Sequence, residues 1–348
     1  MSINIGEVIK KIRNESGLSQ LDLSKATSID RAQISKIESG VIQGVTYNTI
    51  EKIFYALGNE LVPVSIKQEK KLNIHPFVKW AGGKTQLLST INEYLPKQIN
   101  RYFEPFIGGG ALLFNIQPKE AFVNDSNTDL METFKCFKNN KLFKELKERL
   151  IEHENNHSED YYLKIRGLDR ETNYNDLPIT EKAARLIYLN KACFNGLYRV
   201  NSNGFFNVPS GKKEKVNCFD RKNFEDLHAY FMNSNIHISN VDFEEVVKDA
   251  KQGDFVYFDP PYDTWEEKAS FTSYSKDNFN KEDQARLAKV FAELSNKGVY
   301  VMLSNHNTKY IRELYKDFNI RVVNAKRMIN SNGTGRGNVE EVIITNYE

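Results

Sequence analysis

The first 60 residues show a helical pattern of hydrophobic and polar positions. Apolar residues recur at helical spacing at its start, at Ile5, Val8, Ile9 and Ile12. Ser19 and Asp30 are of the residue types that cap helices, and each precedes another segment of this kind. The pattern predicts four short helices: one ending before Gly17, one from Ser19 to Ala26, one over Arg31–Glu38 with Gly40 beyond it, and one over about Tyr47–Leu57 with Gly58 beyond it.

A different pattern begins at Pro76, where short β-rich runs alternate with helical stretches. The runs predicted as strands are Tyr102–Pro105, Ala121–Val123, Phe255–Phe258, Val299–Leu303 and Glu341–Thr345. Several are continuous apolar runs, which are typical of the buried strands of a parallel sheet. The alternation therefore predicts an open α/β sheet.

Residues 61–75 separate the two patterns, since they lose helical periodicity and contain Pro63 and the charged run KQEKK. We predict a small all-α domain at 1–66, a linker at 67–75 and a larger domain at 76–348. A chain of 348 residues fits two domains better than one.

Composition narrows the classes of protein. With 48 Lys plus Arg against 46 Asp plus Glu, the net charge of +2 excludes a polycation that binds nucleic acid by bulk charge. The three cysteines, Cys136, Cys193 and Cys218, are too far apart for a disulfide framework or a close-spaced zinc site. The six histidines show no ligand spacing, so we predict no metal. With no apolar run long enough to span a membrane and no apolar signal core, we expect a cytoplasmic protein.

A glycine loop follows the first predicted strand. The strand RYFEPF runs into Gly108–Gly110 and then into the helical ALLFNI, so the backbone of the loop can approach a ligand. The dinucleotide fingerprint requires a glycine where Leu113 stands. The string around Lys84 also lacks the first glycine of a phosphate-binding loop, where Val78 stands. The chain is therefore predicted to be neither a dehydrogenase nor an ATPase, because its glycines do not have the spacing that these motifs require.

The second predicted strand ends in Asp125. A carboxylate at this position can accept hydrogen bonds from both hydroxyls of a ribose, so an adenosine-containing cofactor is implied, and S-adenosylmethionine fits. The alternative is that Asp125 caps the helix DLMETF.

The most informative segment is DFVYFDPPYD, in which a buried strand is broken at Asp259, Pro260, Pro261 and Tyr262. The two prolines remove backbone donors, so their carbonyls can accept hydrogen bonds without local competition. An exocyclic amine offers two N–H groups, one for the Asp259 carboxylate and one for the Pro260 carbonyl, while Tyr262 can stack on a flat base. A turn that merely ends the strand is the alternative.

Residues 76–348 closely resemble the Dam-type DNA adenine methyltransferases of class alpha. FVKWAGGKTQLL, FEPFIGGGALLFN, NDSNTDL and FDPPY resemble the motifs of that family in order, and LSNHNT and KRMINSNGTGR match further blocks. The resemblance implies a Rossmann-like S-adenosylmethionine-dependent methyltransferase fold. It also implies an inserted, mostly helical and hairpin target-recognition region at about 133–245.

Cofactor roles are implied by the same resemblance. The residues that match cofactor-binding positions are Trp80, Lys84, Gly108, Gly110, Asp125 and Asp259. Cation–π attraction between Trp80 and a sulfonium, and pairing of Lys84 with the methionine carboxylate, are physically reasonable.

DNA contacts are implied in the segment 191–222, which has 7 basic and 2 acidic residues, an excess hidden by the overall balance. The residues that match DNA-contacting positions are Lys79, Phe194, Asn195, Leu197, Arg199 and Pro209. Arg199 corresponds to the guanine reader, and the set implies the palindrome GATC. Phe194 stands where the best-known relatives have a tyrosine that wedges into the duplex. For Phe205 and Phe206 we favour a hairpin core over base stacking.

The N-terminal string GLSQLDLSKATSIDRAQISKIESG resembles the helix-turn-helix of the phage-repressor (Xre/Cro) family. The resemblance puts Arg31, Gln33 and Lys36 on the helix that enters the major groove. The alternative is a helical interaction module whose charges are simply solvated.

These inferences predict a site-specific DNA methyltransferase that transfers a methyl group from S-adenosylmethionine to the N6 amine of adenine in GATC. The N-terminal module would bind DNA, with autoregulation as one use. The alternatives are a transcription regulator with a methyltransferase-like domain, or an enzyme acting on another amine in DNA or RNA. The predicted partners are double-stranded DNA and S-adenosylmethionine, without metal or membrane, and a companion restriction endonuclease would fit a restriction-modification role.

Overall fold

The computed structural model describes residues 5–60, 71–264, 279–326 and 338–348. Within the chain, two compact units separate at Lys70 and Lys71. The predicted linker, 67–75, lies partly outside the described residues, and so does nearly all of the predicted block KRMINSNGTGR.

The N-terminal unit contains four helices: α1 (Ile5–Glu15), α2 (Gln20–Thr27), α3 (Arg31–Glu38) and α4 (Tyr47–Ala56). The predicted caps are confirmed, since the side chains of Ser19 and Asp30 accept from main-chain N–H groups at the starts of α2 and α3. The core consists of apolar residues from all four helices. Arg13 and Glu38 form a buried ion pair, with 2.6 Å between Arg13 Nε and Glu38 Oε1, which joins α1 to α3.

A seven-stranded sheet forms the centre of the second unit, in the order β3-β2-β1-β4-β5-β7-β6. Its strands are β1 (Tyr102–Glu104), β2 (Glu120–Asn124), β3 (Asn235–Ser239), β4 (Phe255–Phe258), β5 (Tyr300–His306), β6 (Asn319–Lys326) and β7 (Asn338–Thr345). The first five pair in parallel, whereas β7 is antiparallel to both β5 and β6. The predicted α/β fold class is confirmed. Strands β3 and β6 were not predicted from the sequence, nor was the antiparallel direction of β7.

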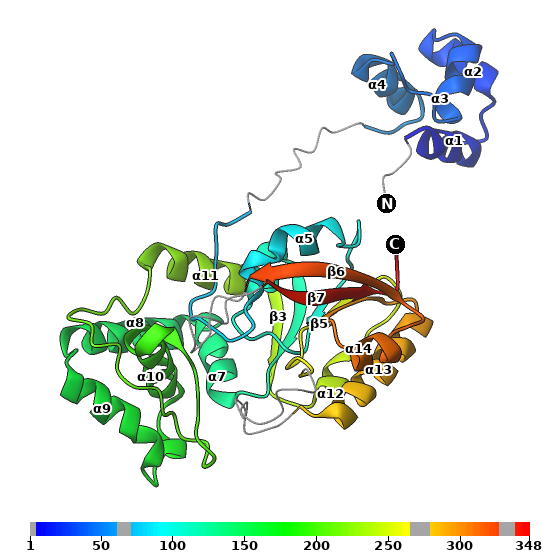
Figure 1. The fold of residues 1–348 in the computed structure, drawn as a ribbon. Coiled ribbons are helices and arrows are strands. Elements are labelled where there is room, and N and C mark those ends of the chain that lie inside the picture. Colours follow the sequence, from blue (N-terminus) through cyan, green and yellow to red (C-terminus); the bar gives the residue numbers. More distant parts are fainter. Residues whose placement is uncertain (1–4, 61–70, 265–278, 327–337) are drawn as a thin grey trace. The chain divides into compact units, whose positions relative to one another are not determined.

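Helices cover both faces of this sheet (Figure 1). They are α5 (Leu88–Glu93), α6 (Ala111–Ile116), α7 (Thr128–Phe137), α8 (Asn140–Asn155), α9 (Glu159–Gly167), α10 (Ile179–Ala192), α11 (Arg221–Asn233), α12 (Phe243–Val247), α13 (Lys281–Asn296) and α14 (Lys309–Leu314), with 3-10 turns η1 (Lys84–Gln86), η2 (Leu168–Arg170), η3 (Tyr174–Asp176) and η4 (Phe194–Gly196).

Alternate strand residues enter two different cores, as the period of two in a β-strand requires. Tyr102 of β1 and Tyr257 of β4 pack with α6, α7 and α11, whereas Phe103 and Val256 pack with α12, α13 and α14. Helices α8, α9 and α10 lie in the predicted target-recognition region, while β3, within the same predicted span, belongs to the sheet. The parallel strands therefore direct their carboxyl ends to one edge, where ligands of such sheets bind.

Candidate active site and nucleic-acid interface

The loop after β4 carries the predicted catalytic residues at this edge. All four residues of β4 are buried, and Asp259 follows directly. The Nζ of Lys84, from η1, lies 2.7 Å from Asp259 Oδ1, and their side chains are 6% and 16% exposed. The Lys84 ammonium also lies 4.7 Å from the centre of the Tyr262 ring. The fold thus brings together residues that are 175 or more positions apart in the sequence, and pairs Lys84 with Asp259.

Burial raises the pKa of the Asp259 carboxyl to about 6, although Lys84 opposes the rise by favouring the charged form. The nearby charge of Glu341 raises this pKa further. Asp259 is therefore mostly ionised at neutral pH and able to accept a hydrogen bond, and it becomes protonated in mildly acidic solution.

The two proline carbonyls of this loop differ. Gln284 of α13 donates its Nε2–H to the carbonyl oxygen of Pro261 at 2.9 Å. Among the described residues none donates a hydrogen bond to the carbonyl of Pro260. The Pro260 carbonyl can therefore accept from a ligand amine next to the Asp259 carboxylate, which is the arrangement that the sequence predicts.

Buried polar side chains that were not predicted as site residues hydrogen-bond to this loop. Asn305 of β5 donates to Gln284 Oε1 at 3.1 Å and accepts from the main-chain N–H of Asp263 at 2.9 Å. Thr308 donates to the Asp263 carboxylate at 2.6 Å, and His306 Nδ1 lies 2.6 Å from the Asp263 carbonyl oxygen. His306 thus helps to hold the main chain after Tyr262. The main chain is fixed on both sides of Tyr262 by satisfied buried groups.

The predicted cofactor residues lie beside this loop. Asp125, after β2, accepts from the main-chain N–H groups of Gly108 at 3.0 Å and Asn127 at 2.9 Å. The alternative role for Asp125, capping α7, is wrong, because α7 begins at Thr128 and Asn127 is its N-cap. Burial raises the pKa of Asp125, and the two main-chain hydrogen bonds oppose the rise. A carboxylate has lone pairs for further donors, so Asp125 can still accept from a ligand.

Glycine is required where the loop approaches Trp80. Gly108 has a φ of +48°, and a Cβ there would lie 2.9 Å from Cδ1 of the Trp80 indole. Gly110 has a φ of +76°, and its Cβ would lie 2.9 Å from the Phe114 ring. The indole itself stacks on Tyr198 of the predicted target-recognition region, with ring centres 4.7 Å apart. This stack joins the predicted cofactor residue to that region.

A buried amide, that of Asn190, joins Lys79 to the turn that contains Phe194, the residue predicted to wedge into the duplex. Asn190 of α10, 1% exposed, exchanges two hydrogen bonds with the main chain of Lys79, at 2.9 and 2.8 Å, and also donates to the carbonyl of Gly196. Phe194 is 54% exposed, and its N–H donates to the Pro209 carbonyl at 3.0 Å. The structure therefore brings Lys79, Phe194, Pro209 and Asn195, which has a φ of +57°, to one region.

Arg199 lies in the hairpin that follows. Its Nε donates to Asn207 Oδ1 at 2.7 Å, and Asn207 N–H donates back to the Arg199 carbonyl at 3.0 Å. Phe206 is buried, as predicted for a core residue, whereas Phe205 is half-buried beneath the guanidinium of Arg170. Leu197 is also half-buried and packs against the core.

Comparison with known proteins identifies the second unit. Residues 80–329, more than half of the chain, match the D12 class N6 adenine-specific DNA methyltransferase family. The chain belongs to this family. The methyltransferase is 44% identical over 284 residues to the type II methyltransferase M1.LlaDCHI of Lactococcus lactis subsp. cremoris, covering 82% of this chain and 99% of that protein.

More distant relatives agree with this assignment. The type II methyltransferase M.MjaIII of Methanocaldococcus jannaschii is 42% identical over 79% of this chain and 100% of its own length. The DNA adenine methylase of Escherichia coli K12 is 32% identical over 77% of this chain and 93% of its own length. The protein is thus an adenine-specific DNA methyltransferase that requires a methyl donor.

The N-terminal unit matches a helix-turn-helix domain over residues 6–62. The three predicted DNA-contacting residues of the methyltransferase's α3, Arg31, Gln33 and Lys36, are all exposed, while Ile34 and Ile37 of the same helix are buried. The helix α3 thus presents these polar side chains to solvent.

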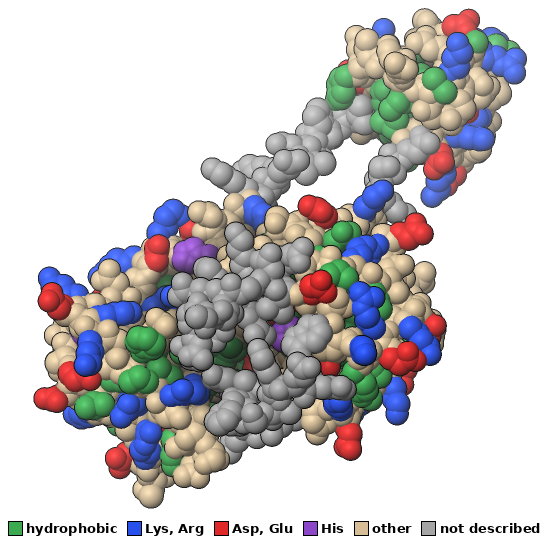
Figure 2. All heavy atoms as spheres, in the orientation of Figure 1, with side chains coloured by type: hydrophobic (Ala, Val, Ile, Leu, Met, Phe, Trp, Pro, Cys, Tyr) green, Lys and Arg blue, Asp and Glu red, His purple; other side chains and the backbone are tan. Residues whose placement is uncertain are grey.

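A lysine-rich hollow of about 400 Å³ lies beside the turn of the methyltransferase that contains Phe194. Its lining is Lys79, Asn190, Lys191, Cys193, Phe194, Asn195, Gly196, Gly211 and Lys213. Burial lowers the pKa of Lys191, and the neighbouring charges of Lys79 and Lys213 lower it further. Figure 2 shows Lys and Arg side chains interspersed with Asp and Glu side chains over the face that it draws.

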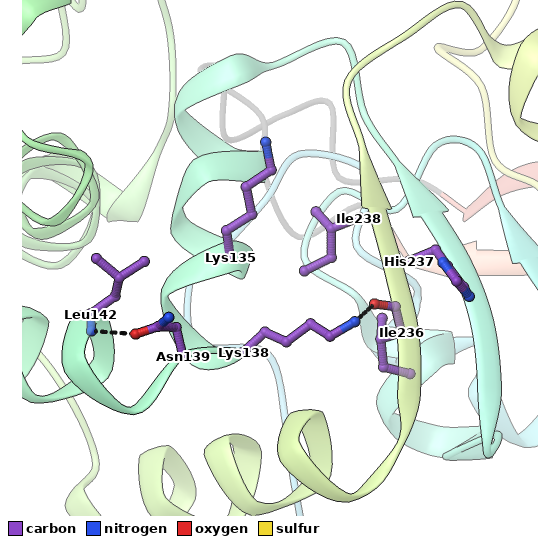
Figure 3. A pocket seen from close by; sticks show the side chains of 7 residues that line it. All are labelled: Lys135, Lys138, Asn139, Leu142, Ile236, His237 and Ile238. Atoms are coloured by element: carbon purple, nitrogen blue, oxygen red, sulfur yellow. Dashed lines mark hydrogen bonds between the residues drawn. The ribbon is translucent and has the colours of Figure 1, made fainter.

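A second hollow, of about 500 Å³, lies at the β3 edge of the sheet (Figure 3). Lys135 of α7 and Lys138, which directly follows this helix, line it, and Lys138 donates to the carbonyl of Ile236 in β3. It shares no residue with the loop after β4. Within the described part of the chain, no cluster of three His, Cys, Asp or Glu side chains could hold a metal ion. Of the helices that the structure describes, none combines the length and apolarity that a membrane span needs.

Proposed function

We propose that the methyltransferase transfers the methyl group of S-adenosylmethionine to the exocyclic N6 amine of adenine in GATC. The observation that carries this proposal is the pairing of an ionisable, buried Asp259 with a neighbouring Pro260 carbonyl that accepts no hydrogen bond from the described residues. Together they match the two N–H groups of an adenine amine. An amine buried in a duplex cannot reach them, so the adenine must leave the stack.

The residues around the loop fit an adenosine-containing methyl donor. Gly108 and the Trp80 indole approach so closely that any side chain at 108 would fill the space between them. Asp125 stands at the end of β2 with lone pairs for ribose hydroxyls. S-adenosylmethionine, when bound, supplies an activated methyl group on a cationic sulfur. Trp80, Lys84, Asp125 and Asp259 are the side chains, with the loop at Gly108 and Gly110, that we assign to hold it.

Asp259 and Pro260 would orient the amine by accepting its two N–H hydrogen bonds, so that the nitrogen lone pair is directed to the methyl group. Tyr262 would stack on the adenine. The hydrogen bond from Gln284 to the Pro261 carbonyl would hold the main chain next to Tyr262 in place. No covalent bond to the protein forms, and the proton released from the amine leaves through Asp259 or solvent. Rate acceleration then comes from positioning and fixed charge.

GATC recognition rests on the residues assigned to base contacts. Arg199, whose Nε donates to Asn207, has the guanidinium geometry to pair with guanine, and Lys79 is assigned to a contact with the first guanine. Leu197 and Pro209 offer apolar contacts for the thymine methyl group, and Phe194 is exposed where a wedge is needed. The phenyl ring can fill the space left by a flipped base, although it lacks a tyrosine hydroxyl.

Methyl incorporation tests this proposal. Purified protein is incubated with S-adenosylmethionine labelled on the methyl group and with a GATC duplex, or with a duplex in which the adenine is changed. We expect label only in the first duplex. No label in either duplex, or equal label in both, would contradict the proposal.

We also propose that the helix-turn-helix binds DNA outside the methylated sequence, through Arg31, Gln33 and Lys36, in the manner of the Xre/Cro family. Its exposed α3 side chains favour this role. Deleting residues 1–66 should leave turnover on a short duplex unchanged within about twofold, since no residue of the assigned site lies there, but should abolish retention on the DNA upstream of the gene. Turnover lost in a truncated protein that is still folded would show instead that this module completes the site.

A further inference from the structure

Three strands of the sheet, β1, β4 and β7, place carboxyl groups on one face at its carboxyl edge, with β5 between β4 and β7. Glu104 follows Tyr102 by two residues in β1, and Asp259 follows Tyr257 by two residues after β4. Glu341 of β7 is two residues from Ile343, which packs in the same core as both tyrosines. Because side chains alternate between faces, the third carboxyl also points to the side of the predicted active site.

Glu340 provides a contrast within the same strand. It alternates with Glu341 and is exposed, and its carboxylate accepts from Asn307 Nδ2 at 2.7 Å. Val342, on the side of Glu340, packs in the opposite core. Two adjacent glutamates of one strand therefore serve opposite faces of the sheet.

Glu341 makes direct contact with the catalytic loop. The Tyr262 hydroxyl donates to Glu341 Oε2 at 3.0 Å. The same ring meets the His306 ring edge-on, with centres 4.9 Å apart, and Lys84 lies over its face. His306 and Glu341 are register partners of β5 and β7. The hydroxyl end of Tyr262 is thus held from β7, while its ring is supported from β5.

We propose that Glu341 is a positioning residue of the methyl-transfer site, which fixes the Tyr262 ring for stacking on the target adenine and places a second negative charge beside Asp259. This inference rests on the proposed function. Glu341 lies 79 residues from Tyr262 and belongs to none of the motifs that identify the catalytic loop.

The charge has a consequence of definite sign. The groups that face Asp259 are Lys84 from η1, Glu104 from β1, Tyr257 from β4, Tyr262 from the loop and Glu341 from β7, with His306 of β5 against Tyr262. Glu341 raises the pKa of Asp259, whereas Lys84 lowers it. Removing the charge of Glu341 must therefore lower that pKa and extend activity to more acidic solution.

Four proteins separate these roles: the wild type, Glu341→Gln, Glu341→Leu and the control Glu340→Leu. The full-length proteins are compared by kcat and KM on a GATC duplex, and by kcat/KM as a function of pH, which reports the groups of the free enzyme. Thermal unfolding shows that each variant is folded.

Glu341→Gln keeps an oxygen that can accept from Tyr262, so we expect kcat within about threefold of wild type, with the acidic limb of kcat/KM moved to lower pH. Glu341→Leu loses the acceptor, so we expect kcat to fall about tenfold. Glu340→Leu should match the wild type in both measurements.

A folded Glu341→Leu protein with the wild-type kcat would overturn the inference, as would an unmoved acidic limb in Glu341→Gln. The Gln variant is informative even if the Leu variant does not fold. Failure of the proposed function is distinguishable, because the wild type itself would then transfer no methyl group to the duplex.

Discussion

The loop after β4 and the segment from Lys191 to Gly211 are both predicted to contact DNA, but they are held in different ways. Gln284 of α13 and Asn305 of β5, which are 1% and 0% exposed, hydrogen-bond to the loop. In the segment from Lys191 to Gly211, the carbonyl of Gly196 accepts a hydrogen bond from the buried Asn190, while Phe194 is exposed to solvent. Chemistry requires fixed atoms, whereas recognition requires an exposed surface on a firm base.

The largest expected effect tests the catalytic loop. Asp259→Ala removes the acceptor for the amine, so kcat should fall by about a thousandfold or more, as when a preorganised group is lost from other active sites. Methyl incorporation into the GATC duplex measures this, with the exposed Asp317→Ala as the control. Appreciable turnover by the Asp259 variant would refute its assigned role.

Support of the loop is tested by Gln284→Leu. This change leaves the Pro261 carbonyl and the Asn305 amide without their partner, and each unpaired buried group costs about 1–3 kcal/mol, so we expect the free energy of unfolding to fall by about 3 kcal/mol. Urea denaturation followed by tyrosine fluorescence measures it. The exposed Gln98→Leu is the matched control, and equal stability of the two variants would show that the amide pair does not support the loop.

A substitution at a residue assigned to base recognition should change the choice of sequence more than the rate of methyl transfer. Arg199→Ala removes one assigned base contact, so discrimination between GATC and a duplex with the guanine changed should fall by about 1–3 kcal/mol, which corresponds to about 5- to 160-fold in kcat/KM. Turnover on GATC should fall less than discrimination does. Arg221→Ala, an exposed arginine of the same basic segment, is the control. Unchanged discrimination would mean that another side chain reads this base.

The smallest effect is expected at the lysine-rich hollow. Lys213→Ala removes a charge suited to a DNA phosphate, so binding should weaken equally for all sequences and the salt dependence of log K should decrease by about one unit. Fluorescence anisotropy at several salt concentrations measures the slope. The exposed Lys297→Ala should keep the wild-type slope, and a sequence-dependent loss in Lys213→Ala would assign it to base recognition.

The same two regions show what the sequence could predict. β4 was predictable because all four of its residues are apolar and buried, while β3 and β6 mix polar with apolar residues and were missed. Asp259 and Lys84 were found from local motifs. Gln284 and Asn305 were not, because their hydrogen bonds form only after α13 and β5 have packed against the loop. The capping role considered for Asp125 was wrong because Asn127, two residues later, takes it.

The position of β7 determines when the enzyme can first become active. β7 follows the other described strands in the sequence, yet it lies between β5 and β6 and contributes Glu341. During synthesis, the helix-turn-helix emerges first and can fold while the sheet still lacks an inner strand. A chain interrupted before residue 338 could therefore still fold its helix-turn-helix domain, but would be unable to complete the sheet on which methylation depends.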